Sequence, residues 1–373
     1  MTTERIPYRY DIVGSFLRKP ELKAARKDFE DGKITAAELK AQEDKSIREL
    51  VADEKKAGLK AVTDGEYRRA FWHLDFLWGL DGVDKVKAEH FSVAFKGFQP
   101  KAETLKITGK IDFPENHPFL DHFHFLKAVA GDTTAKQTIP SPSMLHLICC
   151  VRSTDYQPIE RYQNEEVLLN DIAAAYQKAV KAFYEAGCRY LQFDDTSWGE
   201  FCSADKRKAY AERGIDVDAV GRKYVAVLNK ILEAKPADMT ITMHICRGNF
   251  RSTWSSAGGY EPIADILFSH CHVDGFFLEY DSDRAGTFEP LRFIKDQKVV
   301  LGLITSKTPE LENKEDVIAR IHEAEKYLPL DQLSLSPQCG FASTEEGNLL
   351  TEDEEWAKIR LVKEIAEEIW GND

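Results

Sequence analysis

The chain has 373 residues, 43% of them hydrophobic, which suffices for one large domain or two smaller ones. A formal net charge of -13 argues against nucleic acid and anionic membranes as partners, because both require a basic surface. We find neither a run of eighteen apolar residues nor a signal-peptide pattern in MTTERIPYRY, so we expect no membrane association. Seven cysteines in no regular spacing favour a reduced, cytoplasmic protein over a disulfide framework.

The first part of the chain has an irregular pattern. Residues 21–58 predict a charged helical hairpin that breaks near Gly32, and LKAVTDGE then predicts a strand that ends at Glu66. Residues 82–135 predict an insertion, with FSVAFKGF and ETLKITGKI as the two strands of an antiparallel hairpin. His122 and His124, in DHFHF, would share a strand face there, but no acid or thiol accompanies them. We expect residues 1–373 to form a single domain that includes this insertion.

After residue 160 the pattern alternates between helices and strands. Amphipathic periodicity predicts helices over 165–186, 215–235, 260–270, 288–296, 313–327 and 350–370. Strands are predicted in CRYLQFDD, MTITMHIC, VDGFFLEY, KVVLGLIT and LSLSP. Such βα units predict a parallel sheet covered by helices. A doubly wound sheet is the alternative, but polar groups at so many strand ends converge more easily in a (β/α)8 barrel, which we favour.

Several strand ends carry groups that bind metals. His244 and Cys246 lie two residues apart in MTITMHIC, so both side chains point the same way from a strand. Alone, this pair fits a core histidine beside a small buried cysteine. Two further residues make a metal site the better interpretation. Glu279 follows an apolar run, where an unpaired charge is costly, and Cys339 follows LSLSP. Together the four residues predict a catalytic zinc site.

The charge of this set indicates the kind of reaction. Two thiolates and one carboxylate bring about three negative charges against the two positive charges of zinc. Such a site activates water poorly, but a thiol that binds to the metal still loses its proton and stays nucleophilic. The set therefore favours alkyl transfer to sulfur over hydrolysis.

Further polar residues are candidates for binding a substrate. Asp194 and Asp195 end LQFDD and point to opposite faces, so only one need enter the site. Asp194 and Glu66 are candidates to hold a substrate ammonium, although each also fits the solvated start of a loop. Gly14 and Ser15, in DIVGSF, offer a closely approachable backbone and a hydroxyl, which suit a substrate carboxylate.

Taken together, several segments resemble the catalytic barrel of the cobalamin-independent methionine synthase family. The opening IVGSF resembles its I-G-S-F start, and EKKAGLKAVTDGEYRR resembles the stretch that ends in G-E. LQFDD, MHIC, FFLEYDSDR and LSPQCGF resemble the family's Q-I-D-E, H-x-H/M-C, glutamate-ligand and V-N-P-D-C-G segments. These landmarks occur in family order and cover most of the chain.

The resemblance implies a (β/α)8 barrel with zinc bound by His244, Cys246, Glu279 and Cys339. It further implies a homocysteine-like thiol whose amino-acid end is held by Gly14–Ser15, Glu66 and Asp194. The chain departs from the family in TSKTP, where Lys307 replaces a proton-donating histidine, and in IPSPSMLHL, which has no folate-stacking tryptophan. The methyl donor therefore need not be the usual polyglutamyl folate.

We expect a zinc-dependent S-methyltransferase that makes methionine from homocysteine, with Lys307 as the catalytic candidate for protonating the leaving group or binding an anionic donor. Two alternatives remain open. In one, the same site opens epoxides with a sulfonate thiol, as in epoxyalkane–coenzyme M transferases of the same superfamily. In the other, the barrel is non-catalytic.

Overall fold

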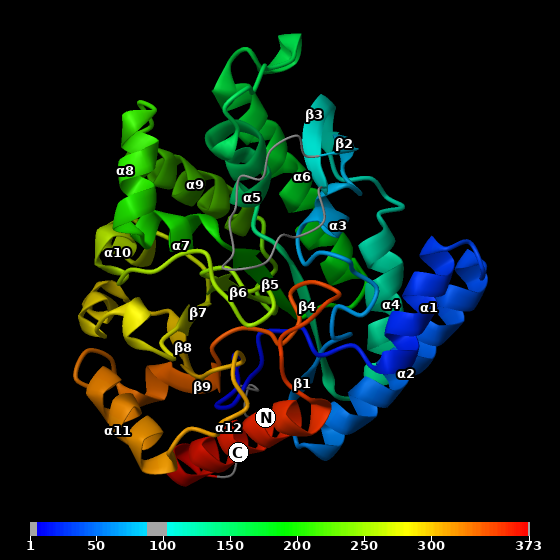
Figure 1. Ribbon diagram of the computed structural model, residues 1–373. Coiled ribbons are helices and arrows are strands. Elements are labelled where there is room, and N and C mark those ends of the chain that lie inside the picture. Colours follow the sequence, from blue (N-terminus) through cyan, green and yellow to red (C-terminus); the bar gives the residue numbers. More distant parts are fainter. Residues whose placement is uncertain (1–5, 88–102, 372–373) are drawn as a thin grey trace.

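The computed structural model describes residues 6–87 and 103–371, and a parallel sheet forms its centre (Figure 1). Its strands pair in the order β1, β4, β5, β6, β7, β8, β9, each parallel to its neighbour. Most of their residues are buried, as in a sheet with both faces covered. The strands span Ala61–Val62, Thr134–Pro140, Tyr190–Asp195, Thr240–Ile245, Gly275–Glu279, Lys298–Ile304 and Leu333–Pro337.

The N-terminal segment joins the two edge strands of this sheet. Tyr10 forms a parallel bridge with Leu335 of β9, and Ser15 forms one with Gly65, which follows β1. The Asp11 amide donates to the Leu335 carbonyl at 3.0 Å, and the Phe16 amide donates to the Gly65 carbonyl at 3.2 Å. The curled sheet is therefore consistent with a TIM-like barrel.

A buried ion pair lies inside the curled sheet, among apolar side chains. Lys136 of β4 donates to Asp11 at 3.2 Å, and both side chains are fully buried. The ammonium also lies over the rings of Tyr190 and Phe277, at 4.7 and 4.1 Å from their centroids. The surrounding apolar residues are Tyr8, Val13, Ala61, Tyr190, Phe277 and Val300.

Helices surround the sheet (Figure 1). Most begin at a side chain that caps the first turn, such as Asp216 for α9, and then bury one face against the strands. None of the helices in the described ranges is long and apolar enough to cross a membrane. The larger ones are α4 (Pro118–Ala130), α6 (Glu165–Glu185), α8 (Ala204–Glu212), α9 (Val217–Leu232), α10 (Glu261–Phe268), α11 (Lys314–Ala324) and α12 (Glu352–Trp370).

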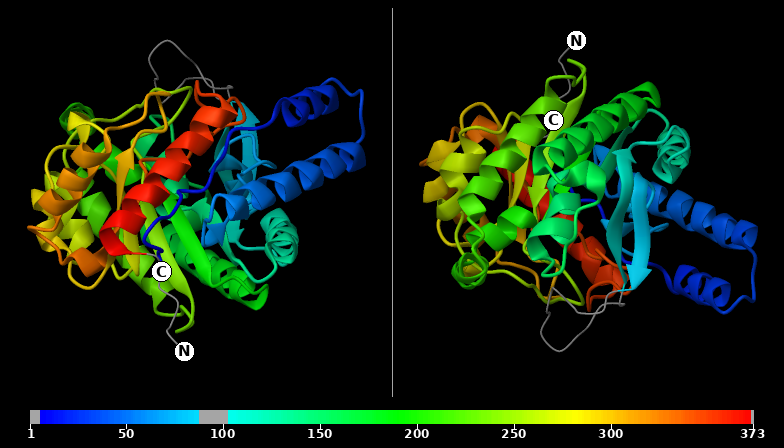
Figure 2. Two further views of the ribbon diagram at one scale, coloured as in Figure 1. Left: turned by 90° about the horizontal axis from the view of Figure 1, so that it is seen from below. Right: turned by 90° about the horizontal axis from the view of Figure 1, so that it is seen from above.

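The helical hairpin expected near the N-terminus corresponds to α1 (Pro20–Glu30) and α2 (Ala36–Lys56). Thr35 begins α2 with a capping box to Glu38, and Gly32 adopts the positive φ of 71° that the turn between the helices requires. Figure 2 shows this pair projecting away from the body of the molecule.

The structure corrects several expectations for the insertion. The partner of β3 (Glu103–Asp112) is β2 (Asp81–Lys87), and the whole of FSVAFKGF lies outside the described residues. His122 and His124 lie on helix α4, not on a strand, because apolar residues recur at helical spacing after Pro118. Residues 134–140 form β4 of the main sheet and do not belong to an insertion.

The sequence analysis missed most of the short helices and predicted one of them too long. The helix expected over 288–296 is a 3-10 helix restricted to Glu289–Phe293. The remaining short elements are α3 (Leu74–Leu77), α5 (Ser143–His146), a π-helix (Leu147–Arg152), α7 (Ser197–Cys202) and three 3-10 turns (Glu160–Tyr162, Asp283–Ala285, Leu330–Gln332).

Candidate active site

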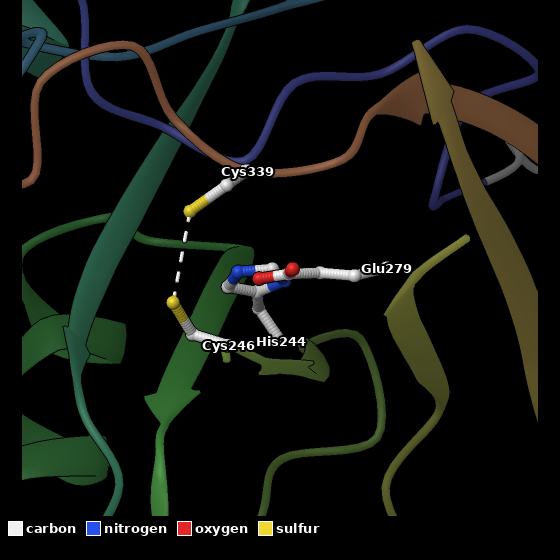
Figure 3. A group of neighbouring side chains, drawn as sticks. All are labelled: His244, Cys246, Glu279 and Cys339. Carbon is white, nitrogen blue, oxygen red and sulfur yellow. Dashed lines mark hydrogen bonds between the residues drawn. The ribbon is translucent and has the colours of Figure 1, made fainter. Parts of the chain in front are cut away.

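Four of the residues expected to bind metal meet at the carboxyl ends of the strands (Figure 3). His244 lies in β6 with Cys246 just after it, Glu279 ends β7, and Cys339 follows β9. One ligand atom from each lies within 4.8 Å of those of the other three, and all four residues are buried. The sulfurs of Cys246 and Cys339 are 3.7 Å apart, and both cysteines are free thiols.

The environment of His244 and Glu279 fits a metal. Both ring nitrogens of His244 are buried and have no hydrogen-bond partner within the described residues, which is costly unless a ligand takes one of them. Glu279 is oriented by two donors: the Arg247 amide at 2.9 Å and the Arg284 guanidinium at 2.8 Å. Such outer partners hold a carboxylate ligand in place.

The ionisable groups of the cluster act strongly on one another. Burial alone would lower the pKa of His244, but the Cys339 sulfur beside the ring, with Asp194 and Glu279, raises it to about 9. The neighbouring Cys246 thiol and the His244 ring hold the pKa of Cys339 well below its usual value, despite burial. Cys339 is therefore the more acidic of the two sulfurs.

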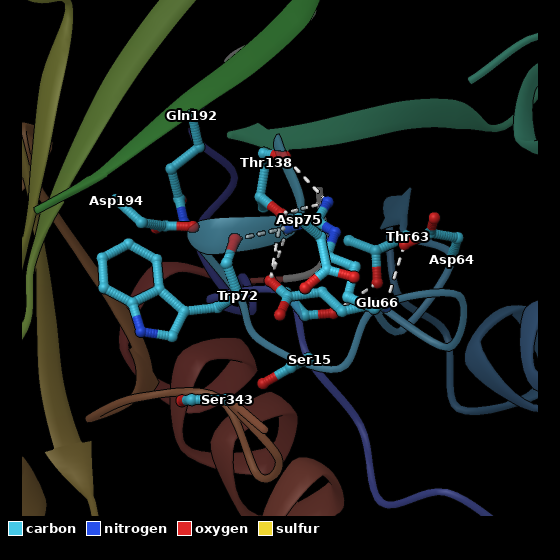
Figure 4. Close-up of polar contacts among 12 residues, drawn as sticks. Ser15, Thr63, Asp64, Glu66, Trp72, Asp75, Thr138, Gln192, Asp194 and Ser343 are labelled. Atoms are coloured by element: carbon cyan, nitrogen blue, oxygen red, sulfur yellow. Dashed lines mark hydrogen bonds and ion pairs between the residues drawn. The ribbon is translucent and has the colours of Figure 1, made fainter. Parts of the chain in front are cut away.

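Glu66 and Asp194, both labelled in Figure 4, lie close enough for their charges to interact, and Asp194 acts in the same way on His244 of the cluster. Glu66 Oε1 accepts from Thr138 at 3.1 Å and pairs with Arg69 at 3.3 Å, whereas its buried Oε2 has no partner within the described residues. Asp194 accepts from Gln192 at 2.8 Å. Burial is the main cause that raises the pKa of Asp194 to about 6.

The second aspartate of LQFDD has a structural role. Asp195 is fully buried and accepts hydrogen bonds from the hydroxyls of Ser143 and Ser197. It thereby joins the end of β5 to the loop after β4 and to the start of α7. Only Asp194 of the two acids is near the metal-binding cluster, as the opposite directions of adjacent strand residues require.

Gly14 and Ser15 lie beside these groups but are also part of the framework. A β-carbon at Gly14 would lie 2.7 Å from a Thr138 methyl and 3.8 Å from Glu66 Oε1, so the backbone passes close to that carboxylate. Ser15 Oγ accepts from the Ala342 amide at 3.2 Å. A β-carbon at Gly340 would lie 2.0 Å from Ser15 Oγ, so glycine is required for this approach of the Cys339 loop.

Lys307 follows β8 and is buried near the metal-binding cluster. Its ammonium donates to Asn249 Oδ1 at 2.9 Å, and Asn249 in turn donates to the Gly340 carbonyl at 2.8 Å. The charge of Lys307 acts on Cys246, Glu279 and Cys339. The structure thus brings all nine residues singled out from the sequence to one end of the barrel.

Two residues near the site were missed from sequence. Arg69 fixes Glu66 through their ion pair and also donates to the Thr138 carbonyl at 2.8 Å. The Trp72 amide donates to the carbonyl of Ser343, whose hydroxyl is 4.0 Å from Cys339 Sγ. Both belong to the loop after β1, in the segment GEYRRAFW. Their only signal in the sequence is that they follow the candidate residue Glu66 within a few positions.

Comparison with known proteins identifies the family. Residues 10–367 match the family model described as the catalytic domain of cobalamin-independent synthase. The chain therefore belongs to the cobalamin-independent methionine synthase family, whose members are methyltransferases.

Individual relatives cover nearly the whole chain. The uncharacterized protein YxjH of Bacillus subtilis is 49% identical over 369 residues, covering 98% of this chain and 96% of its own. The methionine synthase of Saccharolobus solfataricus is 24% identical over 88% of this chain and 86% of its own.

Solved structures show the same architecture. A Listeria monocytogenes protein assigned to the vitamin-B12-independent methionine synthases has a TM-score of 0.77 and 46% identity, covering 98% of this chain and 99% of that one. A B12-independent methionine synthase from Shewanella has a TM-score of 0.67, covering 97% of each chain, and at 21% identity supports the fold alone.

The buried Glu66 carboxyl predicts a pH dependence of stability. Burial, with Asp194 adding and Arg69 opposing, raises the pKa of Glu66 to about 7. Its protonated form stabilises the ligand-free protein fully below the unfolded pKa of about 4.3, and this contribution of about 4 kcal/mol is lost as pH rises from that value through the folded pKa of about 7. In urea unfolding at about pH 5 and pH 8, Glu66→Gln should lose less stability between the two pH values than wild type. Glu323→Gln, at an exposed glutamate, is the control, and equal slopes for Glu66→Gln and wild type would contradict the assignment.

Proposed function

We propose that this protein is a zinc-dependent methyltransferase that transfers a methyl group to the sulfur of homocysteine and forms methionine. The observation that carries the zinc assignment is the separation of the two sulfurs. Two thiolates at about 2.3 Å from one tetrahedral zinc lie about 3.8 Å apart. The sulfurs of Cys246 and Cys339 are 3.7 Å apart, with His244 and Glu279 completing a four-ligand set.

The composition of the ligand set supports transfer to sulfur. Zinc bound there lowers the pKa of an incoming thiol and so supplies a thiolate nucleophile at neutral pH. The chain's own residues orient the ligands: Arg284 and the Arg247 amide hold Glu279. The buried walls of the cluster exclude water, which protects the nucleophile from solvation.

The two nearby acids, Glu66 and Asp194, support the assignment of an amino-acid thiol as the substrate. The Oε2 of Glu66, which has no partner within the described residues, and the carboxylate of Asp194 both suit a substrate ammonium, which would give the buried Glu66 oxygen a donor. We assign Gly14 and Ser15, which pass next to Glu66 and the Cys339 loop, to the carboxylate end of the same substrate. An ammonium held there leaves the thiol of homocysteine directed at the metal-binding cluster.

The position of Lys307 supports a reaction in which the leaving group becomes negatively charged. Its buried ammonium makes one side-chain hydrogen bond, to Asn249, and lies close to the cluster. We assign to it the stabilisation of the negative charge that develops on the methyl donor as the methyl group departs.

The zinc assignment predicts about one zinc ion per chain in purified protein. Cys246→Ser should lower the affinity for zinc more than about tenfold, because a thiolate ligand is lost. Metal analysis with thermal unfolding checks this, and Cys150→Ser, outside the cluster, is the matched control. Full methyl transfer by zinc-free protein would sink the proposal, and a Cys246→Ser variant that simply unfolds would indicate a structural metal in a non-catalytic barrel.

Recognition of the ammonium predicts selectivity between thiols. Asp194→Asn should raise KM for homocysteine about tenfold or more, with a smaller effect on kcat, because a charge-assisted hydrogen bond is lost. Binding of 2-mercaptoethanesulfonate, which has no ammonium, should not weaken. Tighter binding of the sulfonate than of homocysteine by wild type would instead favour the epoxide-opening alternative.

The role of Lys307 predicts a defect in transfer without loss of metal. Lys307→Met should lower kcat about tenfold or more at unchanged zinc content, and Lys307→Arg should restore part of the rate because it keeps the charge. Lys208→Met, at an exposed lysine on α8, is the control. Unaltered kcat in Lys307→Met would remove Lys307 from the reaction.

A further inference from the structure

Arg247 is a fully buried arginine that lies just after β6 and directly follows Cys246. All three nitrogens of its guanidinium are buried and have no hydrogen-bond partner within the described residues. A guanidinium keeps its charge and carries several N–H donors, so its burial is costly unless an anion or a set of acceptors compensates it. The described part of the chain supplies neither, which indicates that Arg247 binds a ligand.

The groups that pack beside this guanidinium are neutral. It lies over the ring of Tyr260, 4.5 Å from the centroid, which compensates its charge only in part. The Tyr260 hydroxyl is already used, because it accepts from the Glu279 amide at 2.8 Å and donates to the Glu279 carbonyl at 3.2 Å. Burial raises the pKa of the Cys202 thiol to about 11, although the charge of Arg247 opposes this shift. Cys202 is therefore an uncharged thiol at neutral pH.

The carboxylates of this region pair with a different arginine. Glu279, whose charge acts on Arg247, accepts from the Arg284 guanidinium at 2.8 Å. Arg284 also pairs with Asp281 at 2.9 Å. Within the described residues no carboxylate oxygen accepts a hydrogen bond from the Arg247 side chain. The positive charge of Arg247 therefore has no acid of its own.

A second buried donor lies in the same place. The hydroxyl of Tyr280, directly after Glu279, is buried and has no partner within the described part of the chain. The charges of Arg247 and Arg320 both act on this hydroxyl. The ring of Tyr280 packs against that of Tyr260, with centroids 5.3 Å apart, so Arg247 and Tyr280 lie against the same aromatic ring. Together they offer N–H and O–H donors and a positive charge.

From this arrangement we propose that Arg247 and Tyr280 form a binding site for a small monovalent anion of the halide class. One negative charge balances the charge of Arg247. Because Arg247, Tyr260 and Tyr280 are fully enclosed, a divalent oxyanion would lose far more hydration energy on entering than a halide ion does. The anion joins the segment after β6 to the end of β7, which carry Cys246 and Glu279. The site needs neither zinc nor substrate, so this inference goes beyond the proposed function and does not depend on it.

Thermal unfolding in matched salts tests for the site in solution. The full chain is kept in sodium gluconate, and sodium bromide replaces the gluconate stepwise at constant ionic strength, so that screening of surface charges stays fixed. The melting temperature of wild type should rise by about 2 °C or more and then saturate, because the ion binds the folded protein and not the unfolded chain. General effects of a salt on protein surfaces do not saturate and act on every variant alike.

Two variants assign the response to the site. Arg247→Met should abolish the rise in melting temperature, because it removes the charge and fills the same space with an apolar side chain. Tyr280→Phe, which loses only the hydroxyl, should bind bromide about threefold or more weakly, and it decides the matter alone if Arg247→Met does not fold. The matched controls are Arg222→Met, at an exposed arginine of α9, and Tyr327→Phe, at an exposed tyrosine, and both should respond as wild type.

Anomalous diffraction from crystals grown in bromide locates the ion. We expect a bromide peak within hydrogen-bonding distance of the Arg247 guanidinium and the Tyr280 hydroxyl, and no such peak in Arg247→Met. A water molecule at that position, a bromide peak only at the metal-binding cluster or on the surface, or an equal melting response in Arg247→Met and wild type would each overturn the anion site. Zinc content is measured on the same samples, and its absence from wild type would contradict the proposed function while leaving the bromide result unaffected.

Discussion

The positions of the candidate substrate and metal groups depend on one buried guanidinium, that of Arg18. It donates hydrogen bonds to four backbone carbonyls, those of Phe16, Glu66, Arg69 and Ala342. These carbonyls belong to the N-terminal segment, the loop after β1 and the loop after β9, which carry Ser15, Glu66 and Cys339. These backbone oxygens compensate the charge of the Arg18 guanidinium, which would otherwise be costly to bury. Because they come from three distant parts of the chain, the same guanidinium also fixes those parts relative to one another.

Two acids of the site are balanced by arginines. Glu279 pairs with Arg284, and Glu66 pairs with Arg69. Asp194, in contrast, accepts from the neutral amide of Gln192. Its carboxylate is therefore the acid best suited to a cationic group supplied by a ligand, and the position of Asp194 on the strand next to His244 connects that group to the metal-binding cluster.

Sequence reasoning recovered the parts of this molecule whose pattern is local. His244 and Cys246 share a strand face, and the helices after residue 160 have clear periodicity, so both were predictable. Strand β4 was missed because Lys136 and Gln137 interrupt its apolar run, and only the barrel shows that Asp11 and backbone carbonyls satisfy them. Trp72 was missed for a similar reason, since its proximity to Cys339 arises from a contact with Ser343 that nothing in its own segment encodes. Strand β3 pairs with β2, which the sequence analysis did not propose, and the pairing expected for FSVAFKGF stays a prediction because that segment lies outside the described residues.

The bridges that join Tyr10 to Leu335 and Ser15 to Gly65 have a consequence for biosynthesis. A growing polypeptide emerges from the ribosome from its N-terminus, so Tyr10–Ser15 leaves early and must wait for β9 before its second neighbour exists. Cys339, which lies just beyond β9, arrives at the same late stage. The candidate active site can therefore assemble only when nearly the whole chain has been synthesised, and until then the N-terminal segment and its charged residue Asp11 remain without their full set of contacts.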